Sequence, residues 1–130
     1  MEFHNYTILI VEDDEIILDI FSRIFKREFN VVSCPTVESF YQALHKFKVD
    51  LFVMDMALGD KKNGLDLIKE LRDSVEYKTT PIVVVSAHAY IRDERIALTA
   101  GADKYIRKPI ENKYLVNEVK RILLDKIHLN

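Results

Sequence analysis

Acidic, hydroxyl and basic side chains stand at the ends of short apolar runs in this sequence. Glu12 and Asp13 follow TILIV, Asp55 follows LFVM, Ser86 follows IVVV, and Lys108 comes shortly after KYI. Several carboxylates in one crevice repel one another unless protons or a cation neutralise them, and their hard oxygen atoms suit Mg²⁺ or Mn²⁺. If a fold brings these residues together, they predict a divalent metal pocket that also holds a lysine and a hydroxyl.

Each of these residues also has a structural interpretation, which is the better one for any residue taken alone. An acid after a strand is often a turn former or a helix N-terminal charge, and Asp14 and Glu15 are interpreted in this way. The joint placement of an acid pair, a further acid, a hydroxyl and a lysine favours the chemical interpretation for the set. Cys34 is the only cysteine, which excludes a disulfide within the chain, and we interpret it as a small buried residue.

The segments that must position these residues alternate between short apolar runs and longer runs of helical period. Five apolar runs predict strands, several of them continuous in Val, Ile and Leu: 7–11, 31–33, 51–54, 82–85 and 104–106. With right-handed crossovers, five such units form an α/β fold, a doubly wound (βα)5 three-layer sandwich around a parallel sheet of order 2-1-3-4-5. In this fold the ligand site lies beyond the carboxyl ends of the strands.

Apolar residues at helical spacing predict which helix faces point toward the sheet. The stripes of the first, second, third and fifth helices are Ile16, Ile17, Ile20, Phe21, Ile24 and Phe25; Val37, Phe40, Leu44 and Phe47; Leu65, Ile68 and Leu71; and Tyr114, Leu115, Val119, Ile122 and Leu123. The fourth helix, about 91–100, has the weakest stripe, with Ile96, Ala97 and Ala100 on one side. Thr36 is the predicted N-cap of the second helix, and Gly101 the predicted C′ residue of the fourth.

Length and composition restrict the class of protein. The 130 residues suffice for one domain, and 48% hydrophobic with 31% charged residues is typical of a folded globular chain. The 19 basic and 21 acidic residues give a net charge of −2, so we expect no direct nucleic acid binding and no anionic lipid surface. No apolar run reaches the roughly 18 residues of a membrane span, and the N-terminus does not resemble a signal peptide, so we expect a cytoplasmic domain.

Four motifs resemble those of response-regulator receiver domains of two-component signalling, the family of the chemotaxis protein CheY. They are ILIVEDD, DLFVMDMALGDKKNG, IVVVSA and AGADKYIRKPI, in the family's order and nearly its spacing. The resemblance covers nearly the whole chain. It implies a CheY-like fold and a single receiver domain over residues 1–130.

The resemblance implies a role for each matched residue of the acidic pocket. Asp13 would bind Mg²⁺, or Mn²⁺, directly, while Glu12 would act through water. Asp55 would be the phosphorylated aspartate and a further metal ligand. The backbone carbonyl of Ala57 would complete the protein ligands, and Ser86 would contact the phosphoryl group.

Further positions are implied to orient the phosphoryl group or to respond to it. Lys108 would pair with Asp55 or its phosphate, and a cis peptide bond before Pro109 would fix the direction of the lysine. Tyr105 matches the aromatic switch position of the family. Ala57 and His88 match positions that modulate dephosphorylation, and His88 has an equally good interpretation as a solvated loop histidine.

The implied function is that of a phosphoacceptor rather than an enzyme, since the domain would catalyse only its own phosphorylation and dephosphorylation. The donor would be a sensor histidine kinase or a histidine phosphotransfer protein. The signal would pass through the face formed by the fourth helix, fifth strand and fifth helix to a downstream protein that the sequence does not name. The domain would be a monomer or a phosphorylation-dependent dimer.

The loop after Asp55 departs from the family pattern. Gly64 stands nine residues on, one more than the commonest spacing, and Gly59 stands where proline is usual. Because Ala57 cannot orient an attacking water, we expect the phosphorylated state to decay more slowly than in receivers with a polar residue there.

Other classes fit less well, but two alternatives stay open. A haloacid dehalogenase-type phosphatase would carry a second acid at the position of Ala57, and a flavodoxin-like carrier would have a phosphate-binding loop in place of EDD. The open alternatives are a fragment of a larger regulator whose output domain is missing, and an interaction module that works without phosphorylation.

Overall fold

Strands and helices alternate strictly along the chain. The computed structural model describes residues 2–87 and 90–128. The strands are β1 (Thr7–Val11), β2 (Asn30–Cys34), β3 (Leu51–Met54), β4 (Ile82–Ser86) and β5 (Lys104–Arg107). The helices are α1 (Glu15–Lys26), α2 (Val37–Lys46), α3 (Gly64–Asp73), α4 (Ile91–Ala100) and α5 (Asn112–His128).

All five strands are parallel and pair in the order β2-β1-β3-β4-β5. The predicted α/β doubly wound sheet is therefore confirmed. The second, fourth and fifth strands extend one residue beyond the apolar runs at one or both ends, because a ladder of hydrogen bonds continues through polar residues as well as apolar ones.

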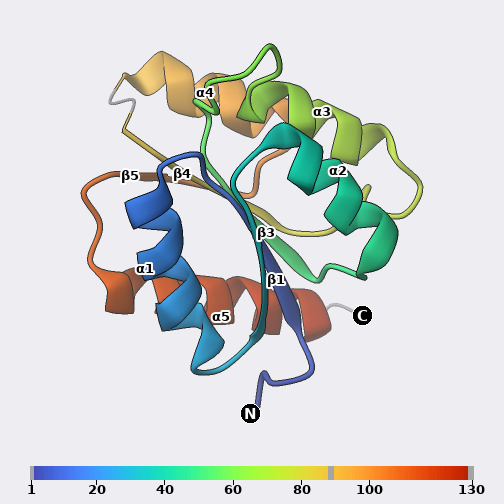
Figure 1. Ribbon diagram of the computed structural model, residues 1–130, viewed down its shortest axis with the longest axis vertical. Helices are drawn as coiled ribbons and strands as arrows, with labels where there is room; N and C mark the ends of the chain where they lie inside the picture. The colour runs from blue at the N-terminus through green and yellow to red at the C-terminus, as the bar shows by residue number, and fades with distance from the viewer. Residues whose placement is uncertain (1, 88–89, 129–130) are drawn as a thin grey trace.

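The helices cover the two faces of the sheet unequally. Figure 1 shows α1 and α5 on one face and α2, α3 and α4 on the other. Each face has its own core: Ile10, Phe25 and Leu115 are fully buried beneath α1 and α5, and Phe40 and Leu67 are buried on the opposite side. The central strands are therefore shielded from water on both faces, and polar side chains occur only at their ends.

Helix ends follow the predicted capping. The Asp14 carboxylate accepts hydrogen bonds from the backbone N–H groups of Ile16 and Ile17 at 3.0 and 3.1 Å, so its structural interpretation is confirmed. Thr36 caps α2 in a reciprocal arrangement with Ser39. Gly101 ends α4 with a φ of 126°, whereas no side chain caps the start of α4 at Tyr90.

The predicted apolar stripes are partly wrong. Five of their members are exposed instead: Ile16, Ile20, Phe47, Ile96 and Tyr114. In α1 the buried side is set by Leu18, Phe21 and Phe25, and the six-residue stripe is wider than the face that the sheet can cover. Two isoleucines of α1 are consequently left on the surface. None of the helices within the described residues is long and apolar enough to cross a membrane.

Candidate functional site

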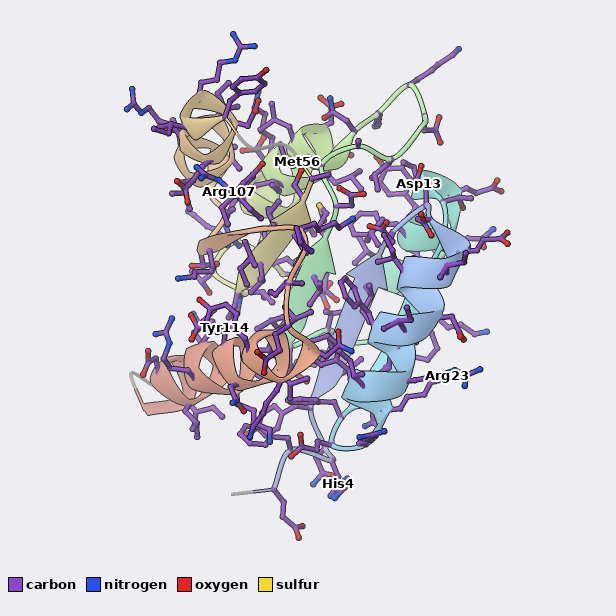
Figure 2. The ribbon with its side chains drawn as sticks, turned by 90° about the vertical axis from the view of Figure 1, so that its left-hand side faces the viewer. His4, Asp13, Arg23, Met56, Arg107 and Tyr114 are labelled. Atoms are coloured by element: carbon purple, nitrogen blue, oxygen red, sulfur yellow. The ribbon has the colours of Figure 1, made fainter. Side chains whose placement is uncertain are left out.

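The register of the central strands brings the predicted residues to one edge of the sheet. Val11 pairs with Met54 across β1 and β3, so Glu12 and Asp55, which follow them, lie side by side. Asp55 is held there by its backbone N–H, which donates to the Val11 carbonyl at 3.0 Å. In Figure 2, Asp13 and Met56 lie toward the same end of the molecule, and His4 lies at the opposite end.

Three carboxylates converge at this edge. One ligand oxygen each from Glu12, Asp13 and Asp55 lies within 4.8 Å of the others. Glu12 is 2% and Asp55 8% exposed, whereas Asp13 is exposed. The predicted convergence is confirmed, and the pocket has a buried floor and an open rim.

Lys108 is the cation that faces the buried pair. Its Nζ lies 3.3 Å from Glu12 Oε1 and 3.5 Å from Asp55 Oδ2. The backbone N–H of Lys108 donates to the Ser86 carbonyl at 2.8 Å, which continues the pairing of β4 and β5. The peptide bond between Lys108 and Pro109 is cis, as predicted. The lysine thus reaches across β4 to Asp55 after β3, and across β4 and β3 to Glu12 after β1.

Burial and the neighbouring charge change how Glu12 titrates. Burial and the adjacent Asp55 carboxylate together raise the pKa of Glu12 from 4.5 to about 8, although Lys108 acts in the opposite direction. One lysine therefore does not neutralise two buried carboxylates, and without a metal the pocket retains a proton near neutral pH. A divalent cation would displace that proton on binding.

The donor set fits a hard divalent cation. Mg²⁺ and Mn²⁺ prefer carboxylate, carbonyl and water oxygens, and Mg²⁺ keeps several waters, which the exposed side of Asp13 allows. The Ala57 backbone N–H donates to Asp55 Oδ1 at 3.4 Å, so this residue lies at the pocket and its carbonyl remains a predicted ligand. These residues could hold the ion without a further protein ligand.

The two residues predicted to respond to the phosphoryl group are buried close to one another. Ser86 ends β4 and is fully buried, and Tyr105 on β5 is 6% exposed and belongs to the core beneath α4. Tyr105 pairs in register with Val84, two residues before Ser86. His88, predicted to modulate dephosphorylation, lies outside the described residues.

Two glycines contribute to the site in a way that the sequence analysis did not predict. A Cβ on Gly64 would lie 2.3 Å from the carbonyl oxygen of Asp55, and a Cβ on Gly59 would lie 3.0 Å from Asp13 Oδ2. The backbone therefore packs directly against the phosphoacceptor candidate and against a metal ligand candidate. The available signal was the pair of glycines flanking a polar loop, which we interpreted only as extra loop length.

Fold and site together define a class: doubly wound α/β domains that carry an acidic pocket, a lysine and a hydroxyl at the carboxyl edge of the sheet. The chain belongs to the response regulator receiver domain family, whose model matches residues 8–120. It is thus a receiver domain of the two-component systems, as the motifs predicted.

Individual relatives agree with this assignment. The chain is 31% identical over 118 residues to the heme response regulator HssR of Staphylococcus saprophyticus, and 34% identical over 117 residues to the transcriptional regulatory protein CpxR of Klebsiella pneumoniae. These matches cover 90% and 89% of this chain but 51% and 48% of those proteins. The chain spans about half the length of the curated relatives it matches.

Solved structures of similar length share the fold. A CheY-like receiver domain protein from Methanospirillum hungatei has a TM-score of 0.87 and 25% identity, over 96% of this chain and 98% of that one. A response regulator from Chloroflexus aurantiacus has a TM-score of 0.85 and 30% identity, over 92% and 98% of the two chains.

Proposed function

We propose that residues 1–130 form one cytoplasmic receiver domain that accepts a phosphoryl group on Asp55 from a histidine kinase or a histidine phosphotransfer protein. The observation that carries this proposal is the placement of Lys108 between the buried carboxylates of Glu12 and Asp55. A purely structural ion pair would need one acid per lysine, whereas this pocket has a second buried acid and a third at its rim.

The chemistry is nucleophilic displacement at phosphorus. An oxygen of Asp55 forms a bond to phosphorus, and the bond from phosphorus to the donor's imidazole nitrogen breaks. The nitrogen keeps that electron pair and afterwards takes up a proton. A bound Mg²⁺, or Mn²⁺, would supply positive charge to offset the negative charge of the attacking and transferring oxygens.

Residues of this chain hold the reacting groups in place. Lys108, fixed by its backbone bond to Ser86, points its ammonium group at the oxygen of Asp55 and lowers the repulsion between carboxylate and phosphoryl group. Asp13 at the open rim and Glu12 on the floor would hold the cation. Ser86 would donate its hydroxyl to the transferred group.

The phosphorylated state would be read out on the face formed by α4, β5 and α5. Tyr105 belongs to the core beneath α4, and Ser86 pairs in register with Arg107 of β5, whose guanidinium lies 3.8 Å from the Glu94 carboxylate of α4. Figure 2 labels Arg107 and Tyr114 of this face. Among the described residues, no side chain caps the start of α4. A change in the position of Ser86 on phosphorylation would therefore shift the population of α4 between its conformations.

The donor would dock over α1 and the turn that follows β5. A groove of about 450 Å³ lies there, lined by Ile17, Ile20, Phe21, Lys108, Pro109 and Ile110. Lys108 lines both this groove and the acidic pocket, so a protein that delivers a phosphoryl group to Asp55 must cover this edge. An apolar helical surface carrying the phosphohistidine is the chemistry that fits.

The chain matches only about half of the length of its curated relatives, so two arrangements of the domain are compatible with the match. The domain would act either alone or as the receiver part of a longer regulator, as a monomer or a phosphorylation-dependent dimer, with a downstream protein as its target and no direct contact with nucleic acid or membrane. An interaction module that works without phosphorylation is the alternative, although the complete acidic pocket favours the phosphoacceptor.

Intact mass measurement after incubation with acetyl phosphate and Mg²⁺ tests the proposal. We expect one phosphoryl adduct on the wild type and none on Asp55→Ala, because the nucleophile is lost. The matched control is Asp60→Ala, an exposed acid of the same loop, which should be modified like the wild type. An adduct that is independent of Asp55, or no adduct at all, would overturn the assignment.

A further inference from the structure

The loop between β3 and α3 lies directly over the metal pocket. At Gly59 the chain has a φ of 61°, and its backbone approaches Asp13 so closely that a Cβ would lie 3.0 Å from the carboxylate. Position 59 is therefore strained for any other residue. Where the loop sits thus sets how much room the Asp13 carboxylate and its ligand have.

Packing holds this loop at only part of its length. Leu58 is 5% exposed and belongs to the core, but Gly59 and the residues up to Asn63 are exposed. On the side of α4, a cavity of about 380 Å³ separates the loop from Asp93 and Ile96. Contact with α4 therefore does not fix the far half of the loop.

On the opposite side, one loop residue is bound to two helices. Lys62 donates from Nζ to the Tyr41 hydroxyl of α2 at 2.8 Å and lies 3.2 Å from Glu70 Oε2 of α3. The Tyr41 hydroxyl in turn donates to Glu70 Oε1 at 2.8 Å. We call Tyr41, Lys62 and Glu70 the loop clamp.

The loop clamp has more mutual contacts than an isolated surface ion pair. The side chains of Lys62 and Glu70 are 49% and 42% exposed, and an isolated pair with such exposure contributes little. Here the Tyr41 hydroxyl accepts from the ammonium and donates to the carboxylate, so all three groups fix one another's direction, and the ammonium also lies 5.1 Å from the centre of the Tyr41 ring.

We propose that Lys62, held by Tyr41 and Glu70, is a positioning residue that keeps the loop against Asp13 and so sets the affinity of the acidic pocket for a divalent cation. The proposal rests on the metal binding of the proposed function. It assigns a role to a residue that is remote from the reacting atoms and that lies in the part of the loop where the chain is one residue longer than the commonest family spacing.

Titration calorimetry with Mg²⁺ alone, on the unphosphorylated protein, tests the role of the loop clamp. For Lys62→Met we expect the dissociation constant to rise roughly threefold to tenfold, which is at or below the lower end of the effects of residues that contact metal ligands directly, because Lys62 acts through the loop. Tyr41→Phe, which keeps the ring but removes the shared hydroxyl, should change the constant in the same direction. Lys62→Arg, which keeps a positively charged donor at this position, should retain most of the wild-type affinity.

A matched control distinguishes the effect of the contacts of Lys62 from the effect of its charge on Mg²⁺ binding. Lys61→Met removes the same positive charge from the neighbouring exposed residue, and a lost cation near the pocket by itself strengthens cation binding. We therefore expect Lys61→Met to bind Mg²⁺ as tightly as the wild type or slightly more tightly. Weaker binding by both variants would overturn the proposal.

Urea unfolding without Mg²⁺ distinguishes positioning from a merely structural role. If the clamp only joins α2 to α3, Lys62→Met will unfold at lower urea with an unchanged Mg²⁺ dissociation constant, and that result would overturn the proposal but leave the phosphoacceptor function intact. A wild type that is not phosphorylated and binds no Mg²⁺ would overturn both.

Discussion

Lys108 is shared between two buried carboxylates, and the burial of Glu12 beside Asp55 makes the pocket sensitive to pH. Glu12 lies on the dry floor beside Asp55, and its pKa is raised to about 8. Since the same group titrates near 4.5 in an unfolded chain, the folded and unfolded states bind different numbers of protons between these two values. Glu12 therefore couples the stability of the metal-free domain to pH.

We expect the free energy of unfolding of the metal-free domain to fall by more than about 1 kcal/mol as pH rises from 5 to 8. Over this window the unfolded chain has released the Glu12 proton, whereas the folded chain still holds it, so rising pH favours unfolding. Urea titrations in a chelator at several pH values measure the slope.

Glu12→Gln should remove most of this slope, because glutamine has no proton to lose. Glu15→Gln, at an exposed acid in the first turn of α1, is the matched control and should keep it. A slope that persists unchanged in Glu12→Gln would show that another group is responsible. Added Mg²⁺ should reverse the trend, since the cation binds the deprotonated pocket.

Ala57 predicts a slow loss of the phosphoryl group. Its side chain is exposed beside Asp55 and has no atom that could direct a water molecule toward phosphorus. For Ala57→Asn we expect dephosphorylation to speed up about threefold to tenfold, equivalent to roughly 0.7 to 1.4 kcal/mol in the barrier. The decay of the phosphorylated mass peak after removal of acetyl phosphate measures it, and fast decay in the wild type, unchanged by the substitution, would contradict the prediction.

Most residues of the site could be predicted from the sequence, because each stands at the end of an apolar run and strand ends meet at one edge. The titration of Glu12 could not, since it depends on how many atoms cover the side chain. The close approaches of Gly59 to Asp13 and of Gly64 to Asp55 also could not be predicted. A glycine in the sequence can indicate that no side chain fits at that position, but it does not show which group occupies the space.

At the scale of elements, the start of α3 packs against the segment after β3 that carries Asp55, the proposed phosphoacceptor. Asn63 caps this helix by accepting from the backbone N–H of Asp66 at 3.1 Å, and Gly64 donates its own N–H to the Met56 carbonyl at 2.9 Å. The helix therefore begins within contact distance of the Asp55 backbone. Its first residue has no space for a side chain.

Gly64→Ala should destabilise the domain by about 1 to 3 kcal/mol and slow phosphorylation, because the added Cβ would overlap the Asp55 carbonyl, which is backbone and cannot turn aside. Asn63→Ala is the control: it removes the cap, costs about 1 kcal/mol, and places no new atom beside Asp55. Equal phosphorylation rates in these two variants would contradict the close-contact explanation. Urea unfolding and adduct formation with acetyl phosphate measure the two effects.

The order and type of elements could be predicted better than their buried faces. Runs such as LFVM and IVVV are buried on both faces of the sheet, and their continuous apolar sequence indicates a central parallel strand. The stripe of α1 contains more isoleucine than the sheet can cover, and periodicity alone does not show which members remain outside. The weak stripe of α4 did indicate an element with few buried residues, of which Ala97 is one.

At the scale of the whole molecule, the exposed Ile20 of α1 lines the groove that reaches Lys108, and the exposed Ile16 stands one turn before it on the same helix. Ile16 is 73% and Ile20 42% exposed, and contact with another protein would remove this apolar area from water. The same edge of the sheet thus carries both the proposed site and an apolar surface on which a donor protein would dock.

Ile20→Ser should slow phosphoryl transfer from a histidine kinase about tenfold, equivalent to a loss of about 1.4 kcal/mol of contact energy, without changing the rate with acetyl phosphate. The small donor needs no docking surface, so its rate reports on the pocket alone. Val75→Ser, at a fully exposed apolar residue after α3, is the control and should change neither rate. A parallel loss with both donors would place the effect in the pocket rather than at the surface.

The ion pair between Lys108 and Glu12 joins residues 96 positions apart in the chain. Since synthesis proceeds from the N-terminus, a nascent chain that has emerged only through β4 already carries every acid of the pocket but lacks the lysine that offsets their repulsion. The proposed site is therefore complete only when β5 joins the sheet, so acceptance of a phosphoryl group on Asp55 would require that Lys104–Arg107 has already paired with β4.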